Sequence, residues 1–228
     1  MHTLTLIIIL AYAPSLAILW YFYHKDKYEP EPKTYVILTF IYGALNSVII
    51  ALFFEQLLFQ FIPRTIFTIA LISGFVEEIT KGYIIRIPYK ARQMDGIMDG
   101  VVYGVAAGLG FAATENLLYG MGFGIGISLQ RALLTPIAHG VWTATVGVGY
   151  GLKAENKLKY PLMYFYFAAI SLHFLWNYFA LLSRDNPFFF SVVILLILFN
   201  IAIISNFVKA GLKEDRYRYR ESKSATND

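Results

Sequence analysis

The sequence predicts an all-α fold: a polytopic bundle of about seven transmembrane helices, with the N-terminus outside and the C-terminus in the cytoplasm. Three observations lead to this prediction. The 228 residues are 57% hydrophobic and only 15% charged, whereas a soluble domain has roughly 25% charged residues. Apolar stretches of about 20 residues, the length that crosses a bilayer, recur along the chain. The basic residues gather in every second loop between those stretches.

The apolar stretches define the predicted helices, and short connections separate them. Taken in order, they lie at residues 3–23, 35–59, 65–86, 99–119, 127–150, 160–182 and 188–209. The first is apolar from Thr3 onward with no Lys or Arg before it, so we expect a first span and no cleavable signal. Most prolines fall near the ends of these stretches or at expected kinks, namely Pro14, Pro63, Pro88, Pro136, Pro161 and Pro187.

The positive-inside rule gives the expected orientation. An exterior N-terminus places 15 of the 19 basic residues in the cytoplasmic loops and the C-terminal tail. Arg64, Arg131 and Arg184 fall in exterior segments, and Lys81 lies inside a span. A six- or eight-span count would break this alternation, so seven spans are expected.

The domain organisation follows from the spans. Residues 1–210 form one transmembrane domain, and residues 211–228 form a basic cytoplasmic tail, expected to lie solvated at the anionic inner leaflet. The chain has no cysteine, which excludes disulfides, thiolate metal sites and a cysteine nucleophile. Nucleic-acid binding is not expected, because the basic residues sit in short loops and the tail rather than on one soluble face.

Ionisable and amide side chains lie within four of the predicted spans. They are Glu77, Glu78 and Lys81 in the third, Glu115 and Asn116 in the fourth, His139 in the fifth, and His173 and Asn177 in the sixth. An ionisable group at membrane depth costs about 2.5–3.5 kcal/mol on insertion scales, which makes these residues functional candidates. Each has a structural alternative, such as a Glu–Lys pair or an interhelical hydrogen bond, but their joint cost favours a site.

Residue spacing predicts which of these side chains share a helix face. Glu77 and Lys81 are four residues apart and can pair, while Glu78 points about 100° away. His173 and Asn177 are also four residues apart and stack on one face.

Depth in the bilayer relates the spans to one another. Glu77, His139 and His173 each lie about 9–14 residues into their spans, which places all three near the middle of the bilayer. Glu115 fits less well, because a straight fourth span puts it nearer the outer end. Either that helix starts later or kinks at its glycines, or Glu115 sits at the edge of the site.

The residue types suit hydrolysis. A pair of carboxylates in a low dielectric can supply a general base and a general acid near neutral pH. A Glu and a His can hold and deprotonate one water molecule, and an Asn amide or an imidazolium can stabilise the oxyanion. No HExxH motif is present, which excludes a zincin, and neither Ser73 nor Ser171 is in a nucleophile motif.

Other polar and small residues carry structural expectations. Glu55 is expected at the membrane interface, near the outer end of the second span. Asp95 and Asp99 are expected as turn and helix N-cap residues. Three glycines at four-residue spacing are expected to let two helix backbones approach closely, or alternatively to admit an extended peptide. They are Gly100, Gly104 and Gly108.

Four motifs in this order resemble the PrsW family of membrane proteases, which is related to the type II CAAX-prenyl endopeptidases and bacteriocin-processing glutamate proteases. The motifs are EExxK at Glu77, Glu78 and Lys81, a Gly- and Phe-containing approach to Glu-Asn at Gly110, Phe111, Glu115 and Asn116, a lone His139 with Trp142, and HxxxN at His173 and Asn177 with Trp176 between them. The acidic-proline run at residues 28–32 is also similar. The resemblance covers residues from about 14 to 182.

The resemblance implies an intramembrane endopeptidase of the cell membrane that makes the first cut, site-1 cleavage, in a single-span anti-sigma factor. The catalytic residues that it implies are Glu77, Glu78, His139, His173, Asn177 and Glu115, supported by Lys81, Asn116, Phe111 and Trp176. Of the two neighbouring glutamates, Glu78 is expected to be the base, with Glu77 held by Lys81. Glu115 stands where the CAAX endopeptidases have a basic residue, so a metal-ligating or proton-holding role is open.

The leading expectation is a metal-free enzyme with no cofactor, whose partners are a single-span membrane protein substrate and the lipid bilayer. A zinc-dependent intramembrane protease is a near alternative, because Glu and His together make a plausible zinc set. A proton-coupled transporter is a second class, because intramembrane Glu, Lys and His also form proton relays, although no internal repeat is visible. A scaffold that sequesters a membrane partner is a third.

Overall fold

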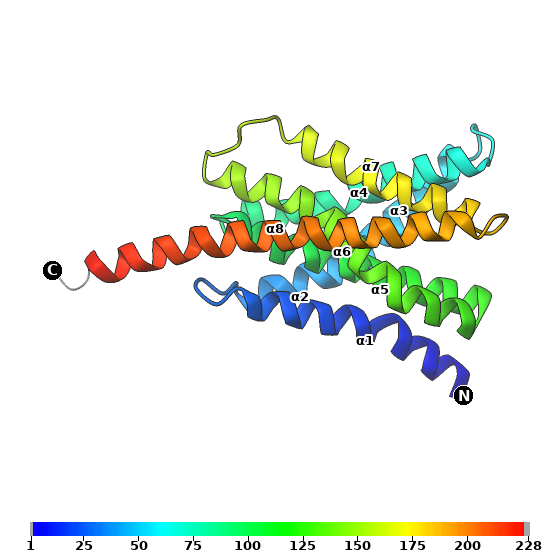
Figure 1. The fold of residues 1–228 in the computed structure, drawn as a ribbon, viewed down its shortest axis with the longest axis horizontal. Helices are drawn as coiled ribbons and strands as arrows, with labels where there is room; N and C mark the ends of the chain where they lie inside the picture. Colours follow the sequence, from blue (N-terminus) through cyan, green and yellow to red (C-terminus); the bar gives the residue numbers. More distant parts are fainter. Residues whose placement is uncertain (1, 226–228) are drawn as a thin grey trace.

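The computed structural model describes residues 2–225, and that part of the chain contains helices and no strands (Figure 1). The helices are α1 (His2–Lys25), α2 (Lys33–Tyr42), the π-helix η1 (Gly43–Ser47), α3 (Val48–Leu58), α4 (Ile66–Lys90), α5 (Ile97–Phe123), α6 (Ile125–Ala154), α7 (Met163–Leu182) and α8 (Phe188–Ala225). Because α2, η1 and α3 follow one another without a break, residues 2–225 form seven continuous helical segments, one for each apolar stretch. The all-α prediction is confirmed.

Five of these segments, within the described residues, are long and apolar enough to cross a membrane. They are Thr3–Lys25, Lys33–Leu58, Ile97–Phe123, Met163–Leu182 and Phe188–Ser224. The other two, α4 and α6, are more polar, because α4 carries Glu77, Glu78 and Lys81 and α6 is rich in Gly and Thr. Five such helices identify a membrane protein, and the full count of seven spans stays a prediction.

The central helix of the bundle is α5, and α1, α2 and α6 pack around it. Its most apolar window is 89% buried inside the protein. The spaced glycines explain how α6 comes so close: a Cβ atom at Gly100 would overlap the carbonyl of Gly147, and one at Gly108 would overlap the carbonyl of His139. The predicted backbone-to-backbone approach of two helices is confirmed.

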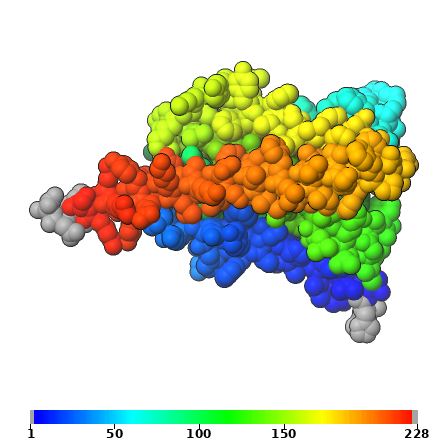
Figure 2. Space-filling view, viewed as in Figure 1, coloured from blue at the N-terminus to red at the C-terminus, as the bar shows by residue number. Residues whose placement is uncertain are grey.

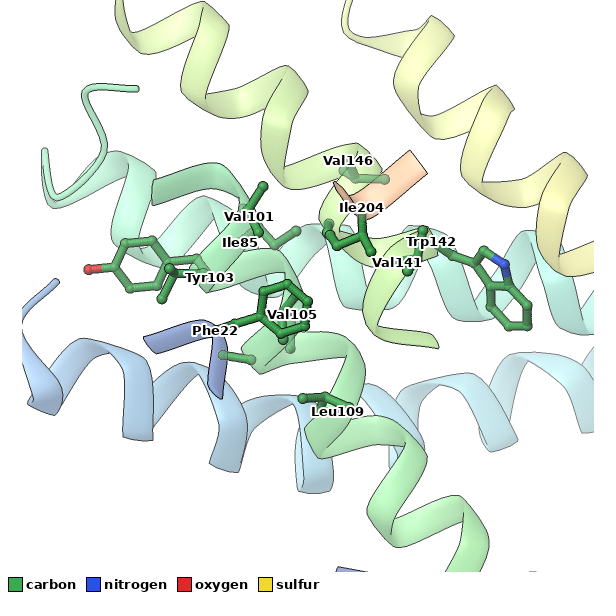
Figure 3. Close-up of a cluster of buried hydrophobic side chains, with 14 of the residues drawn as sticks. Phe22, Ile85, Val101, Tyr103, Val105, Leu109, Val141, Trp142, Val146 and Ile204 are labelled. Atoms are coloured by element: carbon green, nitrogen blue, oxygen red, sulfur yellow. The ribbon is translucent and has the colours of Figure 1, made fainter. Parts of the chain in front are cut away.

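Apolar side chains fill the space around α5 and α6, as Figure 3 shows. The labelled members of this cluster are Phe22, Ile85, Val101, Tyr103, Val105, Leu109, Val141, Trp142, Val146 and Ile204. Trp142 is fully buried, and its ring stacks on the imidazole of His173 with 4.2 Å between ring centroids. The core therefore extends without interruption to the polar residues between α4, α6 and α7, and packing restricts how those residues can move.

The glycine contact gives a direct test of the packing. Gly147→Ala is expected to destabilise the protein by about 1–3 kcal/mol, because the added Cβ would push α6 away from Gly100 on α5. Gly122→Ala on α5 is the matched control, since nothing lies within 4 Å of its would-be Cβ, and it should be neutral or stabilising by up to about 1 kcal/mol. Unfolding in mixed micelles with rising SDS measures both, and equal effects would contradict the packing account.

The last helix differs most from its prediction. α8 continues to Ala225, so the described part of the predicted tail is a helical extension of the seventh segment, with no break at the expected domain boundary. On this extension Asp215 is buried, and Arg218 donates to the Asp95 carboxylate at 2.6 Å. The start of the tail thus packs on the α4–α5 connection instead of lying solvated. The last described turns of α8, up to Ala225, project beyond the body of the protein (Figure 2). Residues 226–228 of the predicted tail lie outside the described residues.

Candidate active site

A cavity of about 380 Å³ lies between α3, α4, α5, α6 and α7. Its polar lining consists of Glu55, Ser73, Glu77, Glu115, Tyr119, Arg131, His139, Asn177 and Arg184. Apolar side chains, Phe111 and Trp176 among them, line the rest. The predicted residues Glu78, Lys81, Asn116 and His173 are buried behind this lining. A mainly apolar cavity with a few converging polar groups is the usual form of a binding site.

Glu78 is the more firmly held of the two neighbouring glutamates. Its Oε1 accepts a hydrogen bond from Lys81 Nζ at 2.5 Å and lies 2.9 Å from His173 Nδ1. Its Oε2 accepts from Thr143 Oγ1 at 3.1 Å. The side chain is fully buried, and both oxygens have partners from the protein. This carboxylate is therefore placed to orient its neighbours rather than to receive a proton from a water molecule.

Glu77, unlike Glu78, has a carboxylate oxygen without a hydrogen-bond partner. Its Oε2 is buried, has no hydrogen-bond partner, and faces the cavity. Around that oxygen lie Lys81 Nζ at 3.6 Å, His173 Nε2 at 3.7 Å and His139 Nδ1 at 4.0 Å. The expected pair of Lys81 with Glu77 is present, but Lys81 lies closer to Glu78, at 2.5 Å against 3.6 Å. An oxygen without a partner among two imidazoles is the place where a water molecule would fit.

The two histidines are oriented by different carboxylates. Because an ionised carboxylate only accepts hydrogen bonds, the contact with Glu78 assigns a proton to His173 Nδ1 and leaves Nε2 as a lone pair facing Glu77. His139 Nε2 lies 3.2 Å from Glu115 Oε2, and its Nδ1 lies 3.1 Å from Lys81 Nζ. The rings are also held by packing, since Phe111 stacks on His139 with 5.6 Å between centroids.

Glu115 lies against the site rather than away from it. Its Oε2 pairs with Arg131 Nη2 at 2.6 Å as well as with His139. Asn116 holds the same arginine, since its Oδ1 accepts from Arg131 Nε at 2.8 Å and from Thr135 Oγ1 at 2.8 Å. Of the two positions expected for Glu115, the edge of the site is the one observed. Asn116 acts indirectly, because its side chain holds Arg131 in place and does not itself line the cavity.

The remaining predicted residues complete one side of the cavity. Asn177 Nδ2 donates to Ser73 Oγ at 2.8 Å, which fixes the amide against α4. Trp176 is buried and packs edge-on against Trp142, with 5.9 Å between ring centroids. Spacing on α7 predicted that the imidazole and the amide of HxxxN face the same way, and both lie beside α4.

Three residues of this site were missed or misplaced by the sequence. Glu55, expected at the membrane interface, also lines the cavity with Glu77, which the sequence did not predict. Arg131, counted as exterior, lies within α6 and pairs with Glu115. The lack of any cation in the fourth span was a signal that Glu115 needed a partner from elsewhere. Thr143, four residues after His139, gave no such signal.

A metal ion fits part of this arrangement. One ligand atom each from Glu77, His139 and His173 lies within 4.8 Å of the others, and all three side chains are buried. Two imidazoles and one carboxylate form a known set for catalytic zinc. Each histidine also has its other nitrogen on a second carboxylate, the pattern that usually orients metal-binding histidines. The orphaned Glu77 oxygen and this donor set are compatible with a divalent cation.

Comparisons with known proteins agree with these motifs. A family profile described as "PrsW family intramembrane metalloprotease" matches residues 31–204. The chain is 30% identical over 197 residues to the Protease PrsW of Halalkalibacterium halodurans, covering 85% of this chain and 92% of that protein. It is 35% identical over 147 residues to the Protease PrsW of Bacillus subtilis, covering 61% and 65%, and 30% identical over 208 residues to that of Clostridioides difficile, covering 85% and 87%. No solved structure matches the chain significantly.

Proposed function

The chain belongs to the PrsW family of intramembrane proteases, and from this premise we propose that it hydrolyses a peptide bond of a single-span membrane protein with a water molecule that Glu77 activates. One observation supports the choice of residue above all others. The Glu77 Oε2 is buried in a cavity, has no hydrogen-bond partner, and faces two imidazoles, whereas both oxygens of Glu78 accept hydrogen bonds. A carboxylate kept free at such cost suits a general base.

The proposed setting is the cell membrane, crossed seven times with the N-terminus outside. Seven continuous helical segments in residues 2–225 and the asymmetric distribution of basic residues support this arrangement. In it, the polar segments α4 and α6 cross the bilayer because the other helices shield their charged and small residues from lipid. The buried positions of Glu78, Lys81 and His139 agree with that shielding.

In the proposed mechanism, a water molecule lies against Glu77 and donates a hydrogen bond to the lone pair of His173 Nε2, which orients the water. Glu77 takes a proton from this water while the water oxygen bonds to the carbonyl carbon of the scissile peptide. The second N–H of the Asn177 amide, whose first donates to Ser73, is available to the oxyanion. Glu77 then returns the proton to the departing amine nitrogen as the C–N bond breaks, which restores the carboxylate.

The surrounding charges have supporting roles. Lys81 fixes Glu78, and Glu78 in turn fixes the tautomer of His173. Arg131 balances Glu115, so that Glu115 can orient His139 without placing an unpaired second charge in the cavity. If a divalent metal binds here, Glu77, His139 and His173 would hold it, and it would polarise the scissile carbonyl and the attacking water.

The cavity and the family resemblance support the proposed substrate class. A second cavity of about 360 Å³ shares Tyr119, Phe123 and Trp176 with the first and is lined mainly by apolar residues. It offers room for the apolar side chains that flank a cut within a membrane span. An anti-sigma factor with one transmembrane helix, cut at site 1 of a regulated proteolysis cascade, is the proposed natural substrate.

Purified protein in proteoliposomes, mixed with a panel of single-span anti-sigma factors, tests this proposal. Wild-type protein is expected to cut at least one of them within or next to its span, as mass spectrometry of the products would locate. His173→Ala is expected to abolish the cut. Proton uptake driven by a pH gradient, with no cleavage of any substrate, would instead favour the transporter.

Metal dependence is tested on the same samples. Elemental analysis of the purified wild type, with cleavage measured before and after a chelator, separates the two forms of the mechanism. A bound transition metal near one per chain, lost together with activity, would establish the metal-dependent form. Full activity after chelation in protein free of metal would establish the metal-free form that the sequence led us to expect.

A further inference from the structure

A second group of buried carboxylates lies far from the cavity. Asp26 and Glu31 come from the α1–α2 connection and Asp99 from the first turn of α5. One oxygen from each lies within 4.8 Å of the others, and the three residues are only 1%, 6% and 3% exposed. Asp99 precedes Glu115 by a stretch of helix about 24 Å long, so the two acidic sites are at different levels of the bundle.

The hydrogen bonds of this group satisfy Glu31 and Asp99 but leave Asp26 without a partner. Tyr103 Oη donates to Glu31 at 2.5 Å, and the Asp95 backbone N–H donates to Asp99 at 2.5 Å. Asp99 is thus not the N-cap of α5, a position that Gly96 holds, and its carboxylate turns inward. Neither oxygen of Asp26 makes a hydrogen bond, although both are buried.

No cation among the described residues neutralises the group. Arg218 pairs with Glu29, Asp95 and Asp215 instead. Arg218 thus shares one positive charge among three other carboxylates, and the Asp215 Oδ2 is also buried without a hydrogen-bond partner. Arg92 lines a cavity with Glu31 and Asp99 but forms no ion pair with either of them. Three adjacent buried carboxylates cannot all stay ionised without a counter-ion.

Protonation energetics agree with this imbalance. Burial, together with the charges of Asp99 and Asp215, raises the pKa of Asp26 to about 7. Burial, together with the charge of Asp99, raises the pKa of Glu31 to about 10. These directions agree with the geometry, in which three buried carboxylates lie together and Asp26 has no partner.

We propose that Asp26, Glu31 and Asp99 bind one hard divalent cation, Mg²⁺ or Ca²⁺. The donors are all oxygen atoms and the site contains no nitrogen or sulfur ligand, which favours these ions over zinc or copper. The Asp26 carboxylate is buried, has no hydrogen-bond partner and lies close to the other two carboxylates. It is therefore free to bind the cation. A cation here joins the α1–α2 connection to the start of α5 and is separate from the proposed catalytic residues.

Calorimetric titration of the full-length protein in detergent with MgCl₂ and, separately, CaCl₂ tests the proposal. One of the two ions is expected to bind at one per chain, and the arm with the tighter binding identifies it. At about 100 times its dissociation constant the ion should raise Tm by on the order of 5 °C. Binding should weaken as the pH falls, because protons compete for the same carboxylates.

Three variants identify the site. Asp26→Asn is expected to bind the ion at least about tenfold more weakly, since it removes one of three charged ligands. Asp95→Asn, which alters a neighbouring carboxylate that is 73% exposed, should bind like the wild type. Glu77→Gln should also bind like the wild type, which separates this site from the cavity.

The outcomes are distinguishable. If Asp26→Asn fails to fold, Glu31→Gln replaces it with the same expectation. The absence of Mg²⁺ and Ca²⁺ binding to the wild type would overturn the proposal and leave protons as the neutralising species. Equal binding by wild type and both ligand variants would overturn it too, and neither result would bear on proteolysis.

Discussion

Glu77→Gln is expected to lower kcat/KM for cleavage of a membrane substrate by about 10²–10⁴-fold, the range that a positioned general base contributes. Glutamine keeps the shape of the side chain but cannot take a proton from water. The Glu77 Oε2 makes no hydrogen bond and only a long ion pair with Lys81 at 3.6 Å, so the substitution removes little that holds the bundle together. The loss should therefore appear in kcat, with the folded protein and its Tm preserved.

Glu55→Gln is the matched control for that experiment, since Glu55 lines the same cavity from α3. It should change kcat/KM by less than about tenfold, because no histidine is paired with it among the described residues. Normal activity in Glu77→Gln would refute the assignment of the base. Loss of activity in Glu78→Gln with Tm unchanged would point to the other glutamate instead.

Lys81→Met is expected to destabilise the protein by about 3–5 kcal/mol, the cost of leaving one partner of a buried ion pair without the other. Lys81 is completely buried, and its ammonium lies 2.5 Å from Glu78 Oε1 and 4.5 Å from the centre of the Phe111 ring. Methionine has a similar volume, so packing is kept while the charge is lost. Unfolding in mixed micelles with rising SDS provides the measurement.

A double-mutant cycle separates charge from packing. Lys81→Met with Glu78→Gln should be more stable than the sum of the single effects predicts, by about 0.5–3 kcal/mol, because it leaves no unpaired charge. Lys157→Met is the comparison on the surface, where the lysine is 54% exposed beside Glu155, and it should cost less than about 1 kcal/mol. Additive effects at Lys81 and Glu78 would contradict the buried pair.

Periodicity and apolar length predicted the helical segments well, because each segment needs only its own residues to form a helix. The meeting of Glu77, His139 and His173 was predicted for the same reason, since depth in the bilayer depends on position along a helix. Which glutamate Lys81 holds could not be predicted. Glu78 and Glu77, three and four residues before Lys81, both lie on the same helix face as Lys81. Contacts of Glu78 with α6 and α7 decide which of the two lies closer to the lysine.

Other misses have tertiary causes. The depth of Glu115 was judged for a straight helix across the bilayer, but its neighbours depend on how α5 and α6 pack. Arg131 was counted with the exterior basic residues, and its pairing with Glu115 depends on how α5 and α6 pack. Asp99 matched the pattern of a cap, and only the folded chain brings Asp26 and Glu31 against it.

The α5–α6 contact also bears on how the chain is made. α5 contains Glu115, whose partner Arg131 is synthesised only after α5 is complete, and α6 is not apolar enough to stand as a candidate span by itself. A single residue, Gly124, separates the two helices. Each helix thus lacks something that the other supplies: an ion-pair partner for α5 and an apolar neighbour for α6. We infer that the translocon releases them into the lipid as one hairpin, with the Glu115–Arg131 pair already formed.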